Sequence, residues 1–337
     1  MTPVSTVTIP QISEDEILVK PLYYIFNLML TSSMFPDIWK KASVTSIFKK
    51  GDSTRVENYK PICILCNFAK AFKSILYQRI YSNIKSFISP FQHGFIEKRS
   101  TVTNLATFSQ FVSEAIDHKH QVDVIYTDFC KAFDQIDHYI LLNKLRCFGF
   151  TEPLLRLMKS YLQGRELFVK HRNFVSNSFS PGSGVPQGSN LGPLLFIIFI
   201  NDVVDVILSY KLLFADDLKL FLEIKSLRDC ELLQEDLNRL ISWSKNNRLY
   251  LNKAKCFIVS YSKKEHILNF NYCIEGGSLS RLEIFKDLGV TFDRNFLFTN
   301  HISECISQAY KMYGFIFRNC REFSNVHALL TLFNSLV

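Results

Sequence analysis

The sequence predicts a mixed fold of the α+β or α/β class, because segments typical of strands and of helices alternate along the chain. The stretch 123–129, DVIYTDF, has the β-branched and aromatic composition of a strand, and Asp128 ends it. Asp137 has the position of a helix N-cap, and apolar side chains then recur at helical spacing until Gly149. Helices that pack on a sheet are the arrangement expected from this alternation.

Further elements follow without an internal repeat or a long linker, so any lobes are formed by a chain that passes between them. Pro153 falls in the first turn of one expected helix, where its missing N–H is tolerated. The elements that the pattern predicts are a helix over 151–164, a hairpin over 166–184, a largely buried helix over 189–208 and an amphipathic helix over 227–247.

Composition places the chain among globular proteins. Its 337 residues are 47% hydrophobic and 21% charged, enough for one large core or several lobes. The longest apolar run, Leu194–Ile200, is far shorter than the roughly 20 residues of a membrane span, so no membrane segment is expected. The formal net charge of +8 suggests a polyanionic partner, and basic residues gather over 40–60. A solvated face is the alternative explanation for that cluster.

Nine scattered cysteines are typical of a reduced, intracellular protein. Cys63 and Cys66 form a CxxC pair, but no second ligand pair lies at the spacing that zinc requires. We therefore expect two half-buried thiols and no structural metal.

The stretch LLFADDLKLF carries two adjacent carboxylates, Asp216 and Asp217, between two apolar runs. These runs, 212–215 and 218–222, predict two short strands joined by a two-residue hairpin loop with both carboxylates at its tip. A divalent cation would neutralise the two like charges. Aspartate is also a favoured turn residue, so an ordinary turn explains this stretch equally well.

Asp128 adds a third carboxylate at a strand end. Carboxylates are ligands of Mg²⁺, which completes its coordination with water and phosphate oxygens, and two such ions can clamp a phosphoryl transfer. The loop SGVPQGS, 183–189, would let backbone approach a substrate closely, although a plain loop is the alternative. Phe133 could wall off a nucleotide 2′-hydroxyl or be an ordinary core residue.

Seven ordered blocks resemble the reverse transcriptases of non-LTR retrotransposons, of the jockey-like and CR1-like groups. The resemblance covers nearly the whole chain. Two blocks resemble finger motifs and five resemble palm motifs. The blocks lie at 35–65 and 91–101 for the fingers, and at 126–134, 183–196, 214–221, 251–256 and 285–290 for the palm.

The resemblance implies an α+β right-hand polymerase whose palm is an antiparallel sheet backed by helices. Fingers would cover 1–120, the palm 121–293 with a finger insertion near 165–182, and a truncated thumb 294–337. It implies RNA-directed DNA synthesis with two Mg²⁺ ions, Mn²⁺ being a possible substitute, on an RNA template with a DNA primer and dNTPs. It implies a nuclear location, without any identified signal, and no endonuclease domain in this chain.

Site residues carry over by position in these blocks. Asp128, Asp216 and Asp217 would hold the metal ions, and Lys255 would be a general acid near the leaving pyrophosphate. Phe133 would be the gate that selects deoxyribose. The other nucleotide-binding residues would be Lys49, Lys60, Phe129, Gln187 and Gly188.

Two departures from the family pattern leave alternatives open. Lys60 stands where arginine is usual, which weakens a bidentate phosphate contact, and Asn190 stands where an apolar residue is usual. A decayed or domesticated copy that binds nucleic acid without catalysis is one alternative. A group II intron maturase is another, although no maturase helical domain is recognisable.

Overall fold

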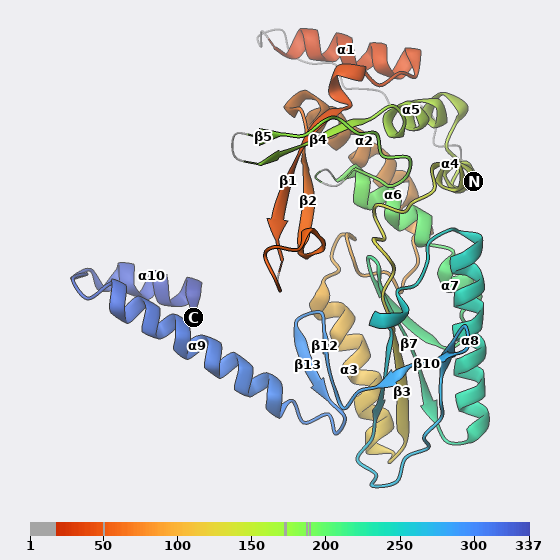
Figure 1. Ribbon diagram of the computed structural model, residues 1–337, viewed down its shortest axis with the longest axis vertical. Coiled ribbons are helices and arrows are strands. Elements are labelled where there is room, and N and C mark those ends of the chain that lie inside the picture. The colour runs from red at the N-terminus through yellow and green to blue at the C-terminus, as the bar shows by residue number, and fades with distance from the viewer. Residues whose placement is uncertain (1–17, 50, 172–173, 187, 189) are drawn as a thin grey trace. The chain divides into compact units, whose positions relative to one another are not determined.

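Helices and strands alternate along the computed structural model, which describes residues 18–49, 51–171, 174–186, 188 and 190–337, without the side chains of residues 57, 60 and 171 (Figure 1). The helices are α1 Val19–Ser32, α2 Asn67–Ile84, α3 Thr101–Asp117, α4 His138–Cys147, α5 Glu152–Leu162, α6 Leu191–Ile200, α7 Val203–Val206, α8 Leu227–Asn246, α9 Thr299–Asn319 and α10 Val326–Leu336. Short 3₁₀ helices are η1 Asp37–Trp39, η2 Val56–Asn58, η3 Lys85–Phe87 and η4 Lys253–Lys255.

The strands are mostly short and mostly antiparallel, which confirms the α+β class. They are β1 Lys41–Phe48, β2 Tyr59–Ile64, β3 Gln121–Thr127, β4 Glu166–His171, β5 Phe174–Val175, β6 Tyr210–Phe214, β7 Asp217–Ile224, β8 Phe257–Tyr261, β9 Cys273–Ile274, β10 Gly277–Ser278, β11 Ser280–Arg281, β12 Ile284–Asp287 and β13 Val290–Asp293. The main sheets have the orders β2-β1-β4-β5 and β11-β8-β3-β7-β6.

The chain divides into two compact units. The first unit runs to Asn104 and also includes Thr127–Lys219 and Glu235–Lys255. The second unit comprises Leu105–Tyr126, Leu220–Gln234 and Cys256–Val337.

A four-stranded sheet and a buried helix organise the first unit. β1 is antiparallel to β2, with Val44 opposite Cys63, and parallel to β4, with Val44 also opposite Val169. Helix α6, LGPLLFIIFI, is almost wholly apolar and almost wholly buried, and α2 and α4 pack against it. A helix that is hydrophobic all round is stable only inside a core, so α6 is the central element of this unit.

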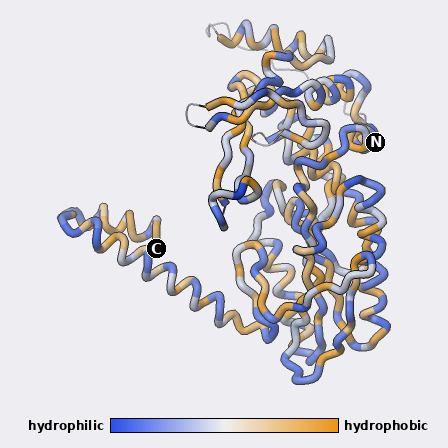
Figure 2. The backbone as a smooth tube through the Cα atoms, in the orientation of Figure 1, coloured by the Kyte–Doolittle hydropathy of each residue, from blue (hydrophilic) through white to orange (hydrophobic). Residues whose placement is uncertain are grey.

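The second unit is built around Phe108 of α3. Its ring packs edge-on against those of Phe221, Tyr261 and Phe292, with centroids 5.4, 5.8 and 5.5 Å away. β3 is antiparallel to β8, with Val124 opposite Val259, and every residue of β3 is buried. Apolar and polar residues alternate along α9, which contacts β13 and α10 (Figure 2).

Most elements confirm the pattern. The Asp137 carboxylate caps α4 by accepting from the backbone N–H groups of Tyr139 and Ile140, and the helices expected over 151–164 and 227–247 are α5 and α8. β4 and β5 form the expected hairpin. Cys63 and Cys66 are half-buried thiols, as expected.

The single helix expected over 189–208 is wrong, because the chain forms α6 and α7 with a break at Asn201 and Asp202. The Asn201 side chain accepts from the Ser89 N–H and donates to the Phe87 carbonyl, at 2.8 and 3.0 Å. Asp202 accepts from Lys144 at 2.7 Å. The polar side chains of the two residues thus bind distant segments at the point where the apolar helix ends.

No helix in the part of the chain that the structure describes is long and apolar enough to span a membrane.

Candidate active site

Asp128 directly follows β3, and two backbone hydrogen bonds fix it there. Its carbonyl accepts from the Asn252 N–H at 2.7 Å, and the Cys130 N–H donates to the Tyr250 carbonyl at 2.8 Å. The segment 250–252 therefore pairs with Asp128 and Cys130, the residues on both sides of Phe129. With its backbone held, the Asp128 side chain remains 30% exposed.

Lys255 lies beside Asp128. The η4 turn is closed by a hydrogen bond of 2.9 Å from the Lys255 N–H to the Asn252 carbonyl, and the Lys255 ammonium then reaches the Asp128 carboxylate at 3.4 Å. The Lys255 side chain is 65% exposed, so it can leave Asp128 at little cost. The structure thus brings these two predicted site residues together.

The turn that carries Asp216 differs by one residue from the expected one. β6 ends at Phe214 and β7 begins at Asp217, so Ala215 and Asp216 form the turn, and the expectation that Asp216 and Asp217 form its tip is wrong. Ala215 has φ 58°, a conformation that turn-forming Gly or Asn adopt more readily. A tertiary contact, rather than the turn residues themselves, therefore selects the position of the turn.

That contact comes from Gln92, which is 2% exposed. Its side-chain oxygen accepts from the Ala215 N–H at 2.9 Å and from the Gly94 N–H at 2.8 Å, and its side-chain nitrogen donates to the Ala215 carbonyl at 3.3 Å. The backbone of the same segment follows β6, where the His93 N–H donates to the Leu213 carbonyl. This segment belongs to the block 91–101, which resembles a finger motif, but nothing in the sequence indicated a role for Gln92.

A side-chain hydrogen bond connects the two carboxylate-bearing segments. The Thr127 hydroxyl, one residue before Asp128, donates to the carbonyl of Leu218, one residue after Asp217, at 2.8 Å. β3 and β7 are neighbours in their sheet. Asp128, which follows the end of β3, therefore lies at the same edge of the sheet as Asp216 and Asp217, which lie at the start of β7. Asp216 is half-buried and Asp217 is exposed.

The two predicted aromatic site residues differ in exposure. Phe133 is half-buried and stacks on Phe196 with a centroid distance of 4.4 Å. Phe129 is only 3% exposed, and its ring packs edge-on against Trp243. The Phe133 ring retains an accessible part, whereas Phe129 supports the backbone next to Asp128.

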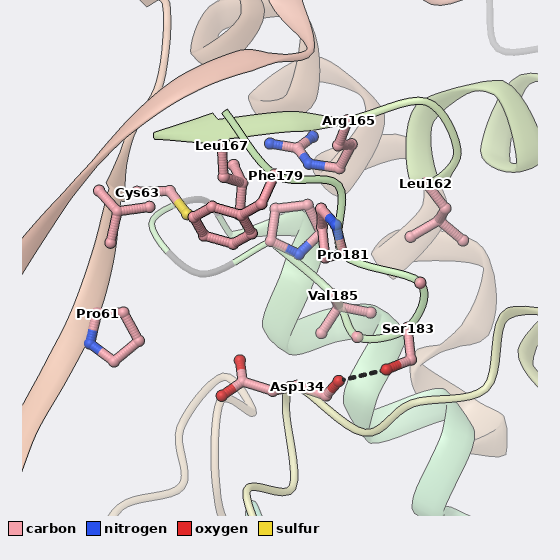
Figure 3. A pocket seen from close by; sticks show the side chains of 14 residues that line it. Pro61, Cys63, Asp134, Leu162, Arg165, Leu167, Phe179, Pro181, Ser183 and Val185 are labelled. Carbon is pink, nitrogen blue, oxygen red and sulfur yellow. Dashed lines mark hydrogen bonds between the residues drawn. The ribbon is translucent and has the colours of Figure 1, made fainter. Parts of the chain in front are cut away.

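The loop before α6 follows the chain that carries Phe133. The Val185 N–H donates to the Phe133 carbonyl at 2.8 Å, and the Ser183 hydroxyl donates to the Asp134 carbonyl at 2.8 Å (Figure 3). Gly188 has φ 109°, and a Cβ there would lie 2.7 Å from the Cys63 carbonyl oxygen, so only glycine fits. The predicted residue Gln187 lies outside the described residues.

The two predicted finger lysines lie on the β1–β2 hairpin. Lys49 directly follows β1 and is exposed, and its N–H donates to the Asn58 carbonyl at 2.8 Å. Lys60 belongs to β2, opposite Ile47, and its side chain lies outside the described part.

The chemistry of the donor set fits a hard divalent cation, since Asp128 and the Asp216–Asp217 pair are carboxylates at adjacent strand ends. Among the described residues, no group of three His, Cys, Asp or Glu side chains could by itself hold a metal ion. Mg²⁺ in phosphoryl-transfer sites uses one or two carboxylates together with water and substrate phosphates. The carboxylates present therefore fit a Mg²⁺ site in which substrate phosphates and water supply the remaining ligands.

The fold and these carboxylates define the class of protein. The chain has the right-hand polymerase fold, as expected, and it is similar in structure to an apo telomerase from Candida tropicalis, with a TM-score of 0.51 at 12% sequence identity. That likeness covers 81% of this chain and 58% of the telomerase chain.

Residues 47–292 match the family described as reverse transcriptase (RNA-dependent DNA polymerase), and the chain belongs to this family. It is 30% identical over 305 residues to the RNA-directed DNA polymerase from mobile element jockey of Drosophila melanogaster. It is 28% identical over 303 residues to the probable RNA-directed DNA polymerase from transposon BS of the same species. Each match covers 86% of this chain and 33% of the relative, so the chain spans about a third of their length. The resemblance to non-LTR retrotransposon reverse transcriptases is confirmed.

Proposed function

We propose that this chain is an RNA-directed DNA polymerase of a non-LTR retrotransposon, which extends a DNA primer on an RNA template with dNTPs. The observation that carries the proposal is the hydrogen bond from Thr127 to Leu218, because it sets Asp128 at the same strand ends as Asp216 and Asp217. Membership of the reverse transcriptase family supports the same reaction.

Asp128 and Asp216, with Asp217, would hold two Mg²⁺ ions, which when bound supply Lewis-acid stabilisation of the reacting phosphate, with Mn²⁺ as a substitute. The primer 3′-oxygen forms a bond to the α-phosphorus, the α–β phosphate linkage breaks, and pyrophosphate leaves. Lys255, next to Asp128, would give a proton to the leaving pyrophosphate. Its exposed ammonium is free to turn from Asp128 toward a triphosphate.

The remaining predicted residues would bind the nucleotide. Phe133, braced by Phe196, would meet the 2′-position of the sugar, and Phe129 would hold the backbone next to Asp128. Gln187 and Gly188 would line the base pocket, and Lys49 and Lys60 would approach the triphosphate from the β1–β2 hairpin. In domain terms we assign fingers to 1–120, the palm to 121–293 with a finger insertion near 165–182, and the start of a thumb to 294–337.

Primer extension on an RNA template with a DNA primer tests the proposal. The 337-residue chain with Mg²⁺ and dNTPs is compared with an Asp216→Ala/Asp217→Ala variant and with a reaction containing a chelator. Extension that requires both the carboxylates and the cation supports the proposal. Template–primer affinity should also fall steeply with salt, because phosphate contacts dominate such binding.

Primer extension, template–primer binding and splicing distinguish the proposed polymerase from the two alternatives. Template–primer binding without extension would favour a decayed or domesticated copy. A splicing defect on loss of the gene would favour a maturase. Activity in cells would be expected in the nucleus, where the DNA target of such an element lies.

A further inference from the structure

A cavity of about 270 Å³ lies in the first unit, beneath the loop that leads to Gln187 and Gly188. Its walls come from β1, β2, the end of α5, β4 and the segment 179–186. The walls are largely apolar and include Val44, Cys63, Leu167, Phe179, Pro181 and Val185 (Figure 3). One wall contains an arginine, Arg165.

Arg165 is 4% exposed. Both terminal guanidinium nitrogens are buried, and neither has a hydrogen-bond partner among the residues that the structure describes. Its guanidinium carbon lies 5.6 Å from the centre of the Tyr161 ring, a contact that orients the side chain but satisfies none of its N–H donors. Because arginine keeps its proton at every physiological pH, this buried charge is costly unless an acceptor arrives.

The neighbouring buried side chain is also basic. Lys73 of α2 is 1% exposed, and its ammonium lies 5.8 Å from the centre of the same Tyr161 ring. The acidic residue of the cavity is Asp134, which Figure 3 shows on the side opposite Arg165. Within the lining, the positive charge is that of Arg165, on one side of the cavity.

We propose that this cavity binds a phosphate group, to which Arg165 donates two parallel hydrogen bonds. The planar fork of a guanidinium matches the oxygens of phosphate bidentately, and an anion would offset the buried charge of Arg165. The choice of phosphate over carboxylate rests on the proposed function, since the cavity adjoins the predicted nucleotide loop. Phe179 and Pro181 lie beside Arg165 in Figure 3, so we expect them to shift when the anion enters.

The phosphate can come from a nucleic-acid strand or from a free nucleotide. Calorimetric titrations of the whole chain with inorganic phosphate, with dNTP and with an RNA–DNA template–primer separate these sources. Arg165→Met is the test variant, and Arg156→Met, an exposed arginine of α5, is the matched control. We expect Arg165→Met to weaken phosphate binding about tenfold or more, while Arg156→Met leaves it unchanged.

Weakening of template–primer binding alone would identify a strand phosphate, and weakening of dNTP binding alone would identify the nucleotide. The melting temperature gives a second test. If Arg165 served only to stabilise the fold, its replacement would lower the melting temperature. Without ligand, Arg165→Met should melt above the wild type, because it removes an unpaired buried charge. A lower melting temperature together with unchanged binding of all three probes would overturn the proposal.

Arg165→Lys covers the case in which the methionine variant does not fold. It keeps the charge but loses the bidentate fork, so phosphate binding should still weaken, and wild-type binding would refute the site. Primer extension by the wild type is measured alongside. If the wild type extends primers but phosphate binding does not depend on Arg165, only the phosphate site is refuted. If phosphate binding depends on Arg165 but the wild type does not extend primers, only the polymerase proposal is refuted.

Discussion

Gln92 and Ala215, 123 positions apart in the chain, are joined by two hydrogen bonds in which one side-chain amide satisfies both backbone groups of Ala215. Ala215 has a positive φ, so its conformation is not one that alanine prefers. Gln92 therefore holds the turn that places Asp216. It is a positioning residue for the candidate active site.

Replacing Gln92 with alanine should reduce extension more than it reduces binding. The buried N–H groups of Ala215 and Gly94 would lose their acceptor, at a cost of about 1–3 kcal/mol in unfolding free energy. We expect primer extension to fall about tenfold or more, because a small displacement of a carboxylate weakens phosphoryl transfer strongly. Template–primer affinity, measured by fluorescence anisotropy, should stay within about twofold because Gln92 makes no phosphate contact in this proposal.

The matched control is Gln110→Ala, because Gln110 is an exposed glutamine of α3 whose side chain donates to Glu114 on the same helix. It should leave extension and unfolding unchanged. Equal losses of extension and template–primer affinity in Gln92→Ala would show that Gln92 supports the fold generally rather than the turn.

Gly94 lets its own backbone lie close to the backbone of Ala215, since it has no side chain. A Cβ at this position would lie 2.2 Å from the Ala215 nitrogen, so Gly94→Ala must displace the turn. We expect Gly94→Ala to lower both the urea midpoint of unfolding and the rate of extension. Gly277→Ala is the control, because a Cβ there would lie 3.6 Å from the nearest atom, the Ile274 carbonyl oxygen, which is an ordinary contact. Wild-type extension by Gly94→Ala would disprove the dependence of Asp216 on this close contact.

The contact between Gln92 and Ala215 also shows what could not be predicted from the sequence. The helix that begins after Asp137 was predictable because its cap and its apolar period are local, and α6 was predictable because an apolar run must be buried. The turn at Ala215 was not, since Asp is a more usual turn residue and only a distant glutamine selects Ala215–Asp216. The pairing of Asp128 with segment 250–252 was likewise non-local.

Motif content was more informative about the site than periodicity was. The carboxylates were indicated by their places at strand ends and by the ordered blocks, Lys255 by the blocks alone, and the structure brings Asp128 and Lys255 together. Arg165 carried no sequence signal, because one arginine among 39 basic residues reveals neither its burial nor its missing partner. Whether a side chain is buried and which groups it contacts depend on tertiary packing, which the spacing of residues along the sequence does not encode.

Lys73 should make stability depend on pH in the alkaline range. Burial and the positive charges of Arg165 and Lys70 lower the pKa of Lys73 to about 7. The unfolded amine titrates near its ordinary value of about 10.4, so between these values the unfolded chain holds a proton that the folded chain lacks. The free energy of unfolding should therefore rise with pH in this window, by up to about 1.4 kcal/mol per pH unit.

Urea denaturation at pH 7 and pH 9 checks this for the wild type, Lys73→Met and the exposed control Lys85→Met. Lys73→Met should be more stable than the wild type at pH 7, and the difference should shrink at pH 9. Lys85→Met should follow the wild type at both values. A wild-type midpoint that tracks Lys73→Met at both pH values would contradict the lowered pKa.

Lys255 is expected to act on the rate of extension rather than on nucleic-acid affinity. Its ammonium lies 3.4 Å from the Asp128 carboxylate, close to where pyrophosphate would leave. Lys255→Met should lower single-turnover extension about 10²-fold or more, the range in which positioned proton donors contribute, while template–primer affinity changes little. Lys263→Met, an exposed lysine after β8, is the control. If Lys255→Met and Lys263→Met extend primers equally fast, Lys255 is only a surface cation paired with Asp128.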